Sequence, residues 1–493
     1  MRLISTTSVR RATTGALLLL VACTSGSNDP TTSDFMITAG PTTGSSTAAP
    51  ETTTPETAAT TTGEELPEII DLYIYENPAN VLSFFVEWET SAPGTGELTV
   101  ECGEEYSQTF VADAEDTLHE AFVMGLLADT TCVVTLSAKM GETVDTRVVE
   151  HEVGPIPAPL PSFAVIAADE AAMEPGWTLV NLVNGFIDAP LHVAALDPKG
   201  RIRWYHGVPT VNEGSDTDVR TVPEGVMVGG TRSSVDPFIF DWEGNTLWTD
   251  DLFMHHDLRT ADGDSTDSLW YLGRSYECDA SFMGIYVDSV VLYDRVAGAI
   301  AWEWLPCDHV TPFDLHEGWD HLNTIEPDGE DGLLISARNQ HQLWYVDRTT
   351  SALLWKMGWD TSDFAVDEDA VFGRQHAPEL QDNGNILLFD NGFTDTREWS
   401  RGLEIAYDLE TMEVHKVWEF RPQPDIFCPI WGDADRLANG NTLMVFGRRG
   451  ATDDTHLFEA DANAEVVWHV ATPEGWGVYR SERMAPRFGE IKR

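Results

Sequence analysis

The sequence predicts an all-β protein, in which a β-sandwich is followed by a six-bladed β-propeller. Strand-length apolar segments, separated by turns rich in Gly, Pro, Asn and Asp, run through residues 67–157 without a competing helical period. In the later part of the chain, a polar turn followed by an apolar strand with a tryptophan recurs six times. Internal repeats of this kind are typical of propellers, in which each copy forms one blade.

The first 23 residues are expected to direct export. Arg10 and Arg11 precede an apolar run over residues 16–22, which is too short to span a bilayer but suits a signal peptide. The run ends in Leu20-Val21-Ala22-Cys23, which resembles a bacterial lipobox. The resemblance implies a lipoprotein whose mature chain begins at a lipid-modified Cys23. An uncleaved anchor would also place the protein outside the cytoplasm.

We therefore expect an exported protein at the periplasmic face of a membrane or at the cell surface. The inner and the outer membrane are alternatives. It would touch the membrane only through its lipid anchor. Residues 24–66 then contain 14 Thr together with Ser, Pro and Gly, and they have too few large apolar side chains to offset the entropy lost on ordering. This segment is predicted to be a disordered linker.

Residues 67–157 are predicted to form the β-sandwich. The segment 125–134, Gly-Leu-Leu-Ala-Asp-Thr-Thr-Cys-Val-Val, resembles the late-strand signature of fibronectin type III modules, with Cys132 where an aromatic residue is usual. A fibronectin type III-like sandwich is therefore expected. Its strands are predicted at 69–75, 83–88, 96–102, 119–124, 132–138 and 146–153.

Five cysteines remain after Cys23, and an exported protein can keep disulfides. Cys102 and Cys132 are expected to clip the sandwich. Cys278 and Cys307 are 29 residues apart in neighbouring repeats and are a second candidate pair. Cys428 would then be a free thiol or the partner of another cysteine.

Residues 158–493 carry the repeats and are predicted to form the propeller. Successive repeat tryptophans are 44, 54, 53, 63 and 50 residues apart, which matches four-stranded blades with variable loops. Each is interpreted as a packing wedge between blades, with no chemical role. The six are Trp204, Trp248, Trp302, Trp355, Trp418 and Trp468.

The charge balance excludes one class of partner. The chain has 82 acidic and 29 basic residues, and only five of the basic ones are Lys. Nucleic acid is therefore not expected to bind, because phosphate binding needs a basic face. The acidity instead keeps the surface solvated.

Three histidines occupy nearly the same position in three successive repeats. The distance to the next turn glycine is 7 residues for His256 and 8 residues for both His321 and His376. If the repeats are radial, these side chains face a shared axis and form one basic pocket with Arg338. His255 is the neighbour of His256; the adjacent Asp257 favours His256.

Common metal and nucleotide motifs are absent from the sequence, which has no CxxC, no HExxH and no P-loop lysine motif. Three imidazoles are nevertheless a ligand set that zinc accepts, so a zinc site stays open as an alternative.

The ordered set His255-His256-Asp257, His321-x-Asn323, Ser336-x-Arg338 and Gln375-His376 resembles the bacterial arylsulfate sulfotransferase family, over roughly residues 160–480. The resemblance implies an enzyme that acts outside the cytoplasm. It would move a sulfuryl group from an aryl sulfate to another phenol through a sulfohistidine, without a nucleotide sulfate donor or any other cofactor. By motif position, His376 matches the covalent histidine. The residues that match the groups around the transferred sulfate are His256, His321 and Arg338.

The chemistry requires such residues independently of the family. A neutral imidazole is a competent nucleophile near neutral pH, and a covalent intermediate divides a difficult transfer into two easier displacements. Negative charge grows on the leaving phenolate and on the sulfuryl oxygens, so Arg338, His321 and His256 are expected as fixed donors there. Asn323 is expected to orient one of these donors. Arg274 is a secondary candidate whose simpler interpretation is a salt-bridged strand end.

Other histidines miss the repeat register, and we expect His309, His316 and His341 to lie in loops or on the surface.

Thr324 and Ala337 stand where the resembled family often has Ser, which is expected to alter donor preference or rate. Two alternative functions belong to other classes of protein. One is a noncatalytic surface propeller that binds proteins or glycans, and the other is a quinoprotein dehydrogenase, which the six repeats, the lack of vicinal cysteines and the histidine-lined axis disfavour.

Overall fold

The computed structural model describes residues 66–184, 191–209, 217–229, 236–263, 265–278, 285–311, 318–329, 331–359, 361–393, 397–447 and 454–493. In these ranges the chain is all-β apart from two short 3₁₀ turns, Pro306–Asp308 and Arg338–Gln340. None of their helices is long and apolar enough to cross a membrane. The predicted signal peptide 1–23, lipidation at Cys23 and nearly all of the linker 24–66 lie outside the described residues.

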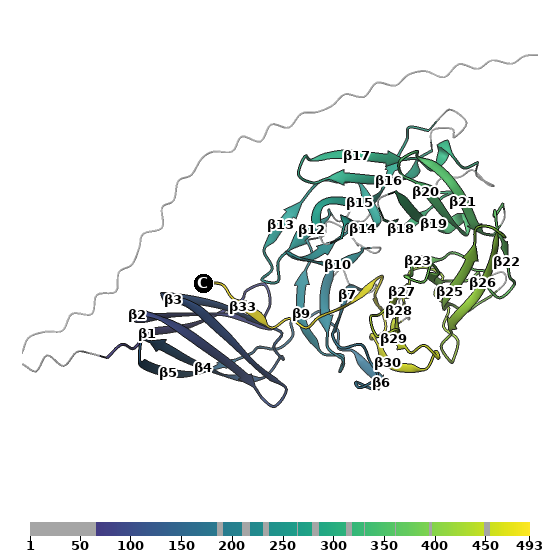
Figure 1. The fold of residues 1–493 in the computed structure, drawn as a ribbon. Helices are drawn as coiled ribbons and strands as arrows, with labels where there is room; N and C mark the ends of the chain where they lie inside the picture. The colour runs from purple at the N-terminus through teal and green to yellow at the C-terminus, as the bar shows by residue number, and fades with distance from the viewer. Residues whose placement is uncertain are drawn as a thin grey trace, which may run out of the picture. The chain divides into compact units, whose positions relative to one another are not determined.

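The N-terminal part of the described chain is one antiparallel sheet (Figure 1). The segments expected as separate strands at 83–88 and 96–102 form a single long strand with irregular pairing around Gly94 and Gly96. All its strands are hydrogen-bonded into this one sheet, so the two-sheet, fibronectin type III-like sandwich stays a prediction. The strands are β1 (Ile69–Glu76), β2 (Ser83–Cys102), β3 (Tyr106–Met124), β4 (Thr131–Met140) and β5 (Thr143–Glu152).

Alternating apolar residues form the core of this sheet. Along β4, buried and more exposed side chains alternate, because successive residues of a strand point to opposite faces. Gly96 lies against the buried indole of Trp88, and a Cβ at that glycine would sit 2.7 Å from the ring. Cys102 and Cys132 are direct cross-strand partners and form the disulfide expected from the sequence.

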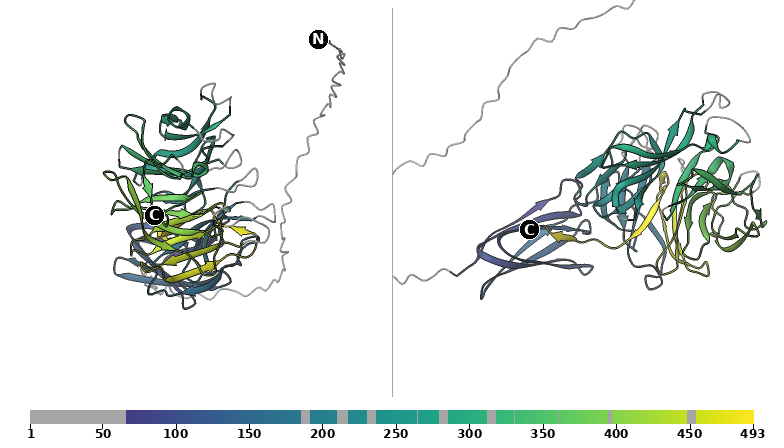
Figure 2. Two further views of the ribbon diagram at one scale, coloured as in Figure 1. Left: turned by 90° about the vertical axis from the view of Figure 1, so that its right-hand side faces the viewer. Right: turned by 45° about the horizontal axis from the view of Figure 1, so that its top comes forward.

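The last strand of the chain returns to this N-terminal sheet. β33 (Gly489–Ile491) pairs with β3, and the phenol of Tyr106 donates a hydrogen bond to the carbonyl of Met124 beside it. The C-terminal segment can be followed from the ring of later strands to this sheet in Figures 1 and 2. The structure thus departs from the predicted division at residue 157, because residues after 488 complete the N-terminal sheet.

The remaining strands of the described residues form six sheets, which are antiparallel except for one short parallel strand in the fifth. The first combines segments from two distant parts of the chain, since two C-terminal strands pair with β7. The second and third are each made from consecutive strands. In order, the first three sheets contain β7 (Trp177–Asn184), β8 (His192–Leu196) and β9 (Ile202–Gly207) with β31 (Trp476–Gly477) and β32 (Ser481–Met484); β10 (Val219–Val222), β11 (Gly225–Val228), β12 (Phe238–Phe240) and β13 (Thr246–Thr249); and β14 (Met254–Asp262), β15 (Ser265–Ser275), β16 (Val287–Asp294) and β17 (Ala299–Trp304).

The last three sheets follow the same four-strand pattern with two additions. A short parallel strand joins the fifth sheet, and β6, from before the first sheet, joins the sixth. These sheets contain β18 (Leu322–Asp328), β19 (Gly332–Ala337), β20 (Gln342–Asp347) and β21 (Ala352–Gly358); β23 (His376–Leu380), β24 (Ile386–Asp390), β25 (Arg401–Asp408) and β26 (Glu413–Phe420) with β22 (Ala365–Val366); and β27 (Asp433–Arg436), β28 (Thr442–Phe446), β29 (His456–Ala460) and β30 (Val466–Ala471) with β6 (Ala164–Ala168).

Hydrogen bonds from backbone N–H groups to side-chain oxygens link the six innermost strands into a closed circle. In each link, a side-chain oxygen at one sheet accepts a hydrogen bond from a backbone N–H of the next. The six pairs are Asp218 with Leu258, Asp257 with Ile325, Thr324 with Ala377, Glu379 with Arg436, Asp433 with Ser481, and Glu482 with Thr221. The sheets therefore surround one axis in a propeller-like arrangement (Figure 1).

The repeated Asp-turn-Trp pattern has a structural role in each sheet. The Asp side chain caps the hairpin turn by accepting a hydrogen bond from a backbone N–H two or three residues later. All six repeat tryptophans lie on the last of the four consecutive strands or its equivalent, β9, β13, β17, β21, β26 and β30. The indole of Trp204 donates to the carbonyl of Trp242 in the next sheet, and that of Trp468 donates to Pro198 across the closure of the ring. These contacts agree with packing wedges between sheets.

A second disulfide joins Cys278 to Cys307, the other candidate pair. It ties the segment after β15 to the 3₁₀ turn that follows β17. Cys428 is buried and belongs to neither disulfide.

Candidate active site

The three histidines lie at or beside pairing irregularities near the start of three innermost strands. The pairing of β14, β18 and β23 with the next strand shifts register between His255 and Leu258, between Leu322 and Thr324, and between His376 and Glu379. Residues at these irregularities have left-handed backbones, with φ of 62° at His256, 43° at His321 and 47° at Ala377. Bulges of this kind re-aim side chains. His256 lies inside its irregularity and His376 at the start of its own, whereas His321 comes one residue before β18, so the three positions are similar and not identical.

The rings of the three histidines and of Tyr479 lie close together. The rings of His256 and His321 are 5.0 Å apart in an edge-to-face arrangement. The ring of the fully buried Tyr479 is 6.1 Å from that of His256 and 6.2 Å from that of His376. Tyr479, which lies just before β32, thus stands between two of the predicted catalytic histidines.

His255 and His256 have different surroundings. Nδ1 of His255 is 2.8 Å from Nδ1 of His256, and its Nε2 is 3.1 Å from both the Gly273 carbonyl oxygen and an Asp288 carboxylate oxygen. Burial opposes ionisation of Asp288, but the charge and hydrogen bond of His255 outweigh it, so its pKa falls to about 2. His255 therefore lies behind His256, and His256 is the one that faces His321 and Tyr479.

The contacts of His376 fix the position of its proton. Its Nδ1 lies 2.7 Å from Oδ1 of Asn391 and 3.1 Å from the carbonyl oxygen of Arg374. The amide nitrogen of Asn391 donates to the carbonyls of Cys428 and Trp431, so Oδ1 is the atom left to face the ring. Both partners of Nδ1 are acceptors. Nδ1 must therefore carry the hydrogen, and Nε2 carries the lone pair in the neutral ring.

Electrostatics keep this imidazole neutral. Burial of the ring, followed by the charge of Arg338, holds the pKa of His376 well below its usual range. Arg338 is 8% exposed and donates to the carbonyl of Pro429 and to the side chain of Asn339. The guanidinium is thus fixed near the histidines at the end of β19.

Asn323 has a different contact from the one expected. Its side-chain amide donates to the backbone carbonyl of Gln375, 2.8 Å away. This bond holds the backbone that leads into β23, the strand that begins at His376. Ala337 is fully buried at the end of β19, paired with Leu322.

Arg480 was missed by the sequence reasoning. It is 2% exposed, and Nη2 donates to the carbonyl of Asn323 and to Oγ1 of Thr324, at 3.1 and 3.0 Å. The same Thr324 oxygen accepts a hydrogen bond from the backbone of Ala377. Asp433 lies 3.4 Å from the other end of the guanidinium. Arg480 lies just before β32, the strand that closes the ring, and has no counterpart in the repeat register, so spacing could not reveal it.

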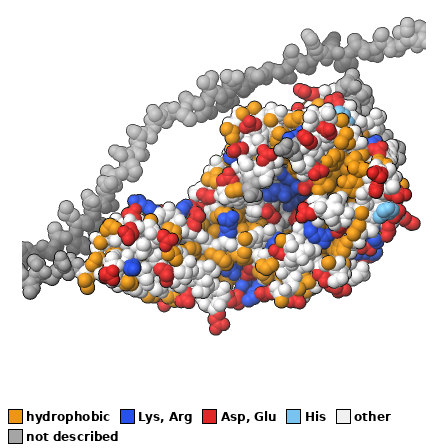
Figure 3. Space-filling view, in the orientation of Figure 1, with side chains coloured by type: hydrophobic (Ala, Val, Ile, Leu, Met, Phe, Trp, Pro, Cys, Tyr) orange, Lys and Arg blue, Asp and Glu red, His pale blue; other side chains and the backbone are white. Residues whose placement is uncertain are grey.

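Further along the axis, buried cations and carboxylates alternate around a pocket of about 220 Å³. Burial raises the pKa of Asp218 to about 6, although the charge of Arg220 opposes this shift. Burial also disfavours ionisation of Asp257, but Arg259, Arg480 and Arg220 together lower its pKa. These arginines are therefore largely matched by carboxylates. Figure 3 shows Lys and Arg side chains gathered in a hollow near the middle of the ring of sheets, with acidic side chains scattered around it.

The secondary candidates have structural partners. Arg274 lies 3.5 Å from Asp288 and over the ring of Tyr286, which agrees with its interpretation as a salt-bridged residue. His309 stacks on Trp304, and His341 packs against Phe393 and Trp359. His316 lies outside the described residues. In the described part of the chain there is no group of three His, Cys, Asp or Glu side chains suited to a metal ion.

Residues 311–472 match the sequence model of the family described as Arylsulfotransferase (ASST). The matched region contains His321, Asn323, Arg338 and His376, and His256 precedes it. The match confirms the resemblance drawn from the sequence motifs. No curated protein matches the chain.

Among solved structures, the chain is similar to a protein of unknown function from Bacteroides caccae, with 12% identity, a TM-score of 0.41, and coverage of 60% of this chain and 93% of that one. It is also similar to a quinoprotein alcohol dehydrogenase-like protein from Bacteroides thetaiotaomicron, with 9% identity, a TM-score of 0.34, and coverage of 81% and 94%. A virginiamycin B lyase from Staphylococcus aureus is similar with 8% identity, a TM-score of 0.34, and coverage of 63% of this chain and 88% of that one.

Proposed function

We propose, from the arylsulfotransferase family membership that residues 311–472 support, that this chain is an aryl-sulfate sulfotransferase. It transfers a sulfuryl group from a phenolic sulfate ester to a phenolic acceptor through a sulfohistidine at His376. No nucleotide sulfate donor takes part. The observation that carries the proposal is the pair of acceptors at Nδ1 of His376, which leaves the Nε2 lone pair for attack.

In the first half-reaction, Nε2 of His376 attacks sulfur and an N–S bond forms. The S–O bond to the aryl group breaks, and the phenolate leaves with the electron pair. The His256–His321 pair donates a proton to the oxygen of this phenolate. The Nδ1 hydrogen bond to Asn391 then stabilises the positive charge on the sulfated ring.

In the second half-reaction, the oxygen of the acceptor phenol attacks the same sulfur. The N–S bond breaks, Nε2 regains its lone pair, and the phenol's proton returns to the His256–His321 pair. Arg338 is the fixed positive charge for the sulfuryl oxygens in both steps. Asn323, Thr324 and Arg480 act indirectly, by holding the backbone on either side of His376.

The six sheets serve, in this proposal, as the six blades of a β-propeller that presents the histidines at its axis. The N-terminal sheet is a fibronectin type III-like spacer, and residues 24–66 are a flexible tether. Cleavage before Cys23 and lipidation of that cysteine would hold the enzyme at the periplasmic face of a membrane or at the cell surface. Labelling of the protein by a lipid precursor, abolished by Cys23→Ser, tests the anchor.

The transfer chemistry is tested by intact-protein mass spectrometry after mixing the purified protein with 4-nitrophenyl sulfate. We expect a gain of one sulfuryl group, its discharge by added phenol, and no gain in His376→Ala. A folded wild-type protein that forms no adduct and releases no nitrophenol would contradict the proposal. That result would favour the alternative, a noncatalytic surface propeller that binds protein or glycan ligands.

A further inference from the structure

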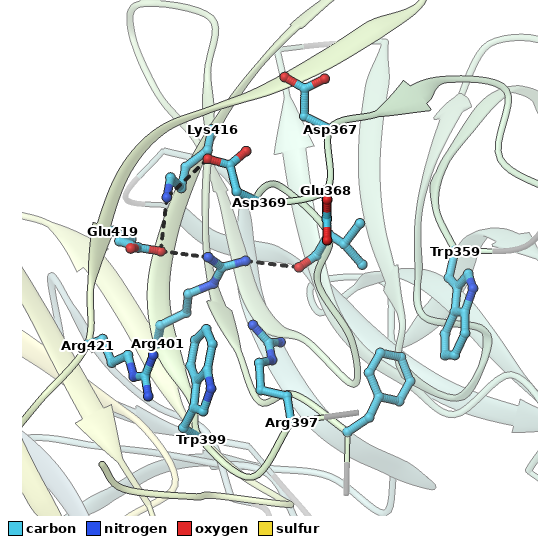
Figure 4. A pocket seen from close by; sticks show the side chains of 12 residues that line it. Trp359, Asp367, Glu368, Asp369, Arg397, Trp399, Arg401, Lys416, Glu419 and Arg421 are labelled. Atoms are coloured by element: carbon cyan, nitrogen blue, oxygen red, sulfur yellow. Dashed lines mark hydrogen bonds and ion pairs between the residues drawn. The ribbon is translucent and has the colours of Figure 1, made fainter. Parts of the chain in front are cut away.

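A pocket of about 880 Å³ opens at the outer strands of the fourth and fifth sheets (Figure 4). Its walls come from the segments that follow β21 and β22, from the segment before β25, and from the outer strand β26. None of His256, His321 and His376 lines it, so it is separate from the histidines at the axis. Its volume lies in the range of about 300–1,000 Å³ that is usual for ligand sites.

One side of the pocket is an exposed aromatic surface. The side chain of Trp359 is 47% exposed, whereas Trp344 on the neighbouring strand β20 is fully buried. The ring of Trp359 lies 4.6 Å from that of Phe393, which in turn lies 4.1 Å from the ring of His341. Nδ1 of His341 accepts a hydrogen bond from the backbone N–H of Arg374, which fixes this imidazole behind the two rings. The pocket therefore has a flat apolar surface in contact with solvent.

The charged side chains of the pocket are paired with one another. Arg401 donates to a carboxylate oxygen of Glu419, 2.6 Å away. The ammonium group of Lys416 lies 3.4 Å from the same carboxylate and 3.2 Å from that of Asp369. These pairs leave little net charge in the wall. Guanidinium and ammonium groups have more N–H donors, and carboxylates more lone pairs, than these bonds use, so the wall can still bond to hydroxyl groups.

Trp399 holds two further guanidinium groups at the polar side. Those of Arg397 and Arg421 lie 4.3 and 4.0 Å from the centre of its ring. Stacking on an indole fixes the plane of a guanidinium, and the N–H groups in that plane keep their hydrogen-bonding role. Figure 4 shows Trp359 across the pocket from Trp399 and Arg397. A ligand that fills the pocket meets an apolar surface at one end and planar polar groups at the other.

This combination selects among classes of ligand. The exposed carboxylates at 367–369 disfavour an anion, and the guanidinium groups disfavour a cation. A neutral oligosaccharide has neither disadvantage. Where the substituents of its rings are equatorial, the hydroxyl groups lie around the edge of each ring and the two faces consist of C–H groups. Such a face packs on an aromatic ring, while the edge bonds to planar donors and acceptors.

We propose that this pocket binds a neutral oligosaccharide with flat, equatorially substituted rings. One sugar ring packs against Trp359 and Phe393, and the hydroxyl groups of the neighbouring rings bond to the paired charged side chains on the opposite side. The site is independent of the proposed sulfotransfer, and a ligand in it does not have to reach His376.

The test is calorimetric titration of the purified protein with cellotetraose and with tetra-N-acetylchitotetraose, two β-1,4-linked probes of this kind. We expect wild type to bind them at one site. Trp359→Ala should weaken the binding by about fivefold to tenfold, since an aromatic contact is lost, and Trp359→Phe should restore most of the affinity. Leu354→Ala, at a half-exposed position of β21, is the matched control and should bind as wild type does.

A second comparison tests the neutral character of the ligand. Glu368 is an exposed side chain of the pocket wall, and Glu368→Gln removes its charge but keeps a hydrogen-bonding oxygen. The affinity for both probes should be the same in this variant as in wild type, and the same at low and high salt. A clear loss of affinity in Glu368→Gln or at high salt would show that charge drives the binding and would overturn the ligand class.

The outcomes for the pocket and for the sulfotransfer are read separately. His376→Ala should bind both probes as wild type does, because the pocket is separate from this histidine. Failure of wild type to bind either probe would overturn the proposal, as would equal binding to wild type and Trp359→Ala. Loss of binding in His376→Ala would place the oligosaccharide at the axis and would also overturn it. None of these results depends on whether the protein transfers a sulfuryl group.

Discussion

Oδ1 of Asn391 lies 2.7 Å from Nδ1 of His376, and the amide nitrogen of the same asparagine is held by two backbone carbonyls. The asparagine therefore cannot rotate without losing three hydrogen bonds. It sets both the ring orientation and the tautomer of the proposed nucleophile. Hydrogen-bond partners of this kind act on chemistry through the residue they orient.

Asn391→Ala is expected to lower the rate of sulfuryl transfer to His376 by about 10–100-fold, the usual cost of losing an orienting partner. The amount of adduct at completion should change little, because Nε2 itself remains. Stopped-flow release of 4-nitrophenolate measures this rate. Asn463→Ala, at an exposed turn, is the control. A rate equal to that of wild type would show that Asn391 does not position the ring.

Arg338 is expected to control the acid limb of the pH profile. Burial and then the charge of Arg338 hold the pKa of His376 well below 6.5. The neutral, nucleophilic form therefore persists through neutral pH, and the rate of adduct formation should fall only in acid. Arg338→Ala removes one cause of the low pKa, so the acid limb should move up toward 6.5. Arg338→Lys keeps the charge and should keep the limb in place, but it loses the planar fork and should transfer more slowly. An unmoved limb in Arg338→Ala would contradict this assignment.

The low pKa of His376 also makes folding stability depend on pH. The unfolded chain protonates this histidine at about 6.5, whereas the folded protein keeps it neutral, so the unfolded state binds more protons just below that pH. The free energy of unfolding should therefore decrease as the pH falls below 6.5. Urea denaturation at several pH values should show a smaller decrease for His376→Gln than for wild type. Identical slopes would mean that folding does not lower the pKa of His376.

Some parts of the fold and site were predictable from local patterns and others were not. The Asp-turn-Trp repeat recurs because each hairpin needs the same cap and wedge, and each of the three histidines lies at or next to an irregularity near the start of an innermost strand. Asn391 follows a strand end, and Tyr479 and Arg480 lie just before β32, the strand that closes the ring, so no repeat register includes them. The fusion of two expected strands into β2 depends on irregular pairing at Gly94 and Gly96, which looks like a turn in the sequence.

Thr324 is expected to stabilise the fold through two buried hydrogen bonds next to His376. Its Oγ1 accepts hydrogen bonds from the backbone of Ala377 and from Arg480, all in a fully buried setting. Thr324→Val has nearly the same shape but leaves both donors without this oxygen, which costs about 1–3 kcal/mol per buried group. Thr324→Ser keeps the oxygen and should lose much less. Urea denaturation measures the difference between the two variants, and equal losses would assign the effect to packing instead of hydrogen bonding.

Replacing His256 is expected to slow the sulfuryl transfer more than replacing His255. His256 faces His321 and Tyr479, where the sulfuryl group would lie, so His256→Ala removes a donor and should lower single-turnover adduct formation by about 10²–10³-fold, as for a lost oxyanion donor. His255 meets Asp288 and the Gly273 carbonyl and touches only the far side of His256, so His255→Ala should cost about 10–100-fold. Asp288→Asn keeps the shape of the carboxylate but removes its charge, and its effect should follow that of His255→Ala. If His255→Ala were the more damaging of the two histidine variants, the ring next to Asp288 would have to approach the substrate, and the arrangement proposed for the transferred group would be wrong.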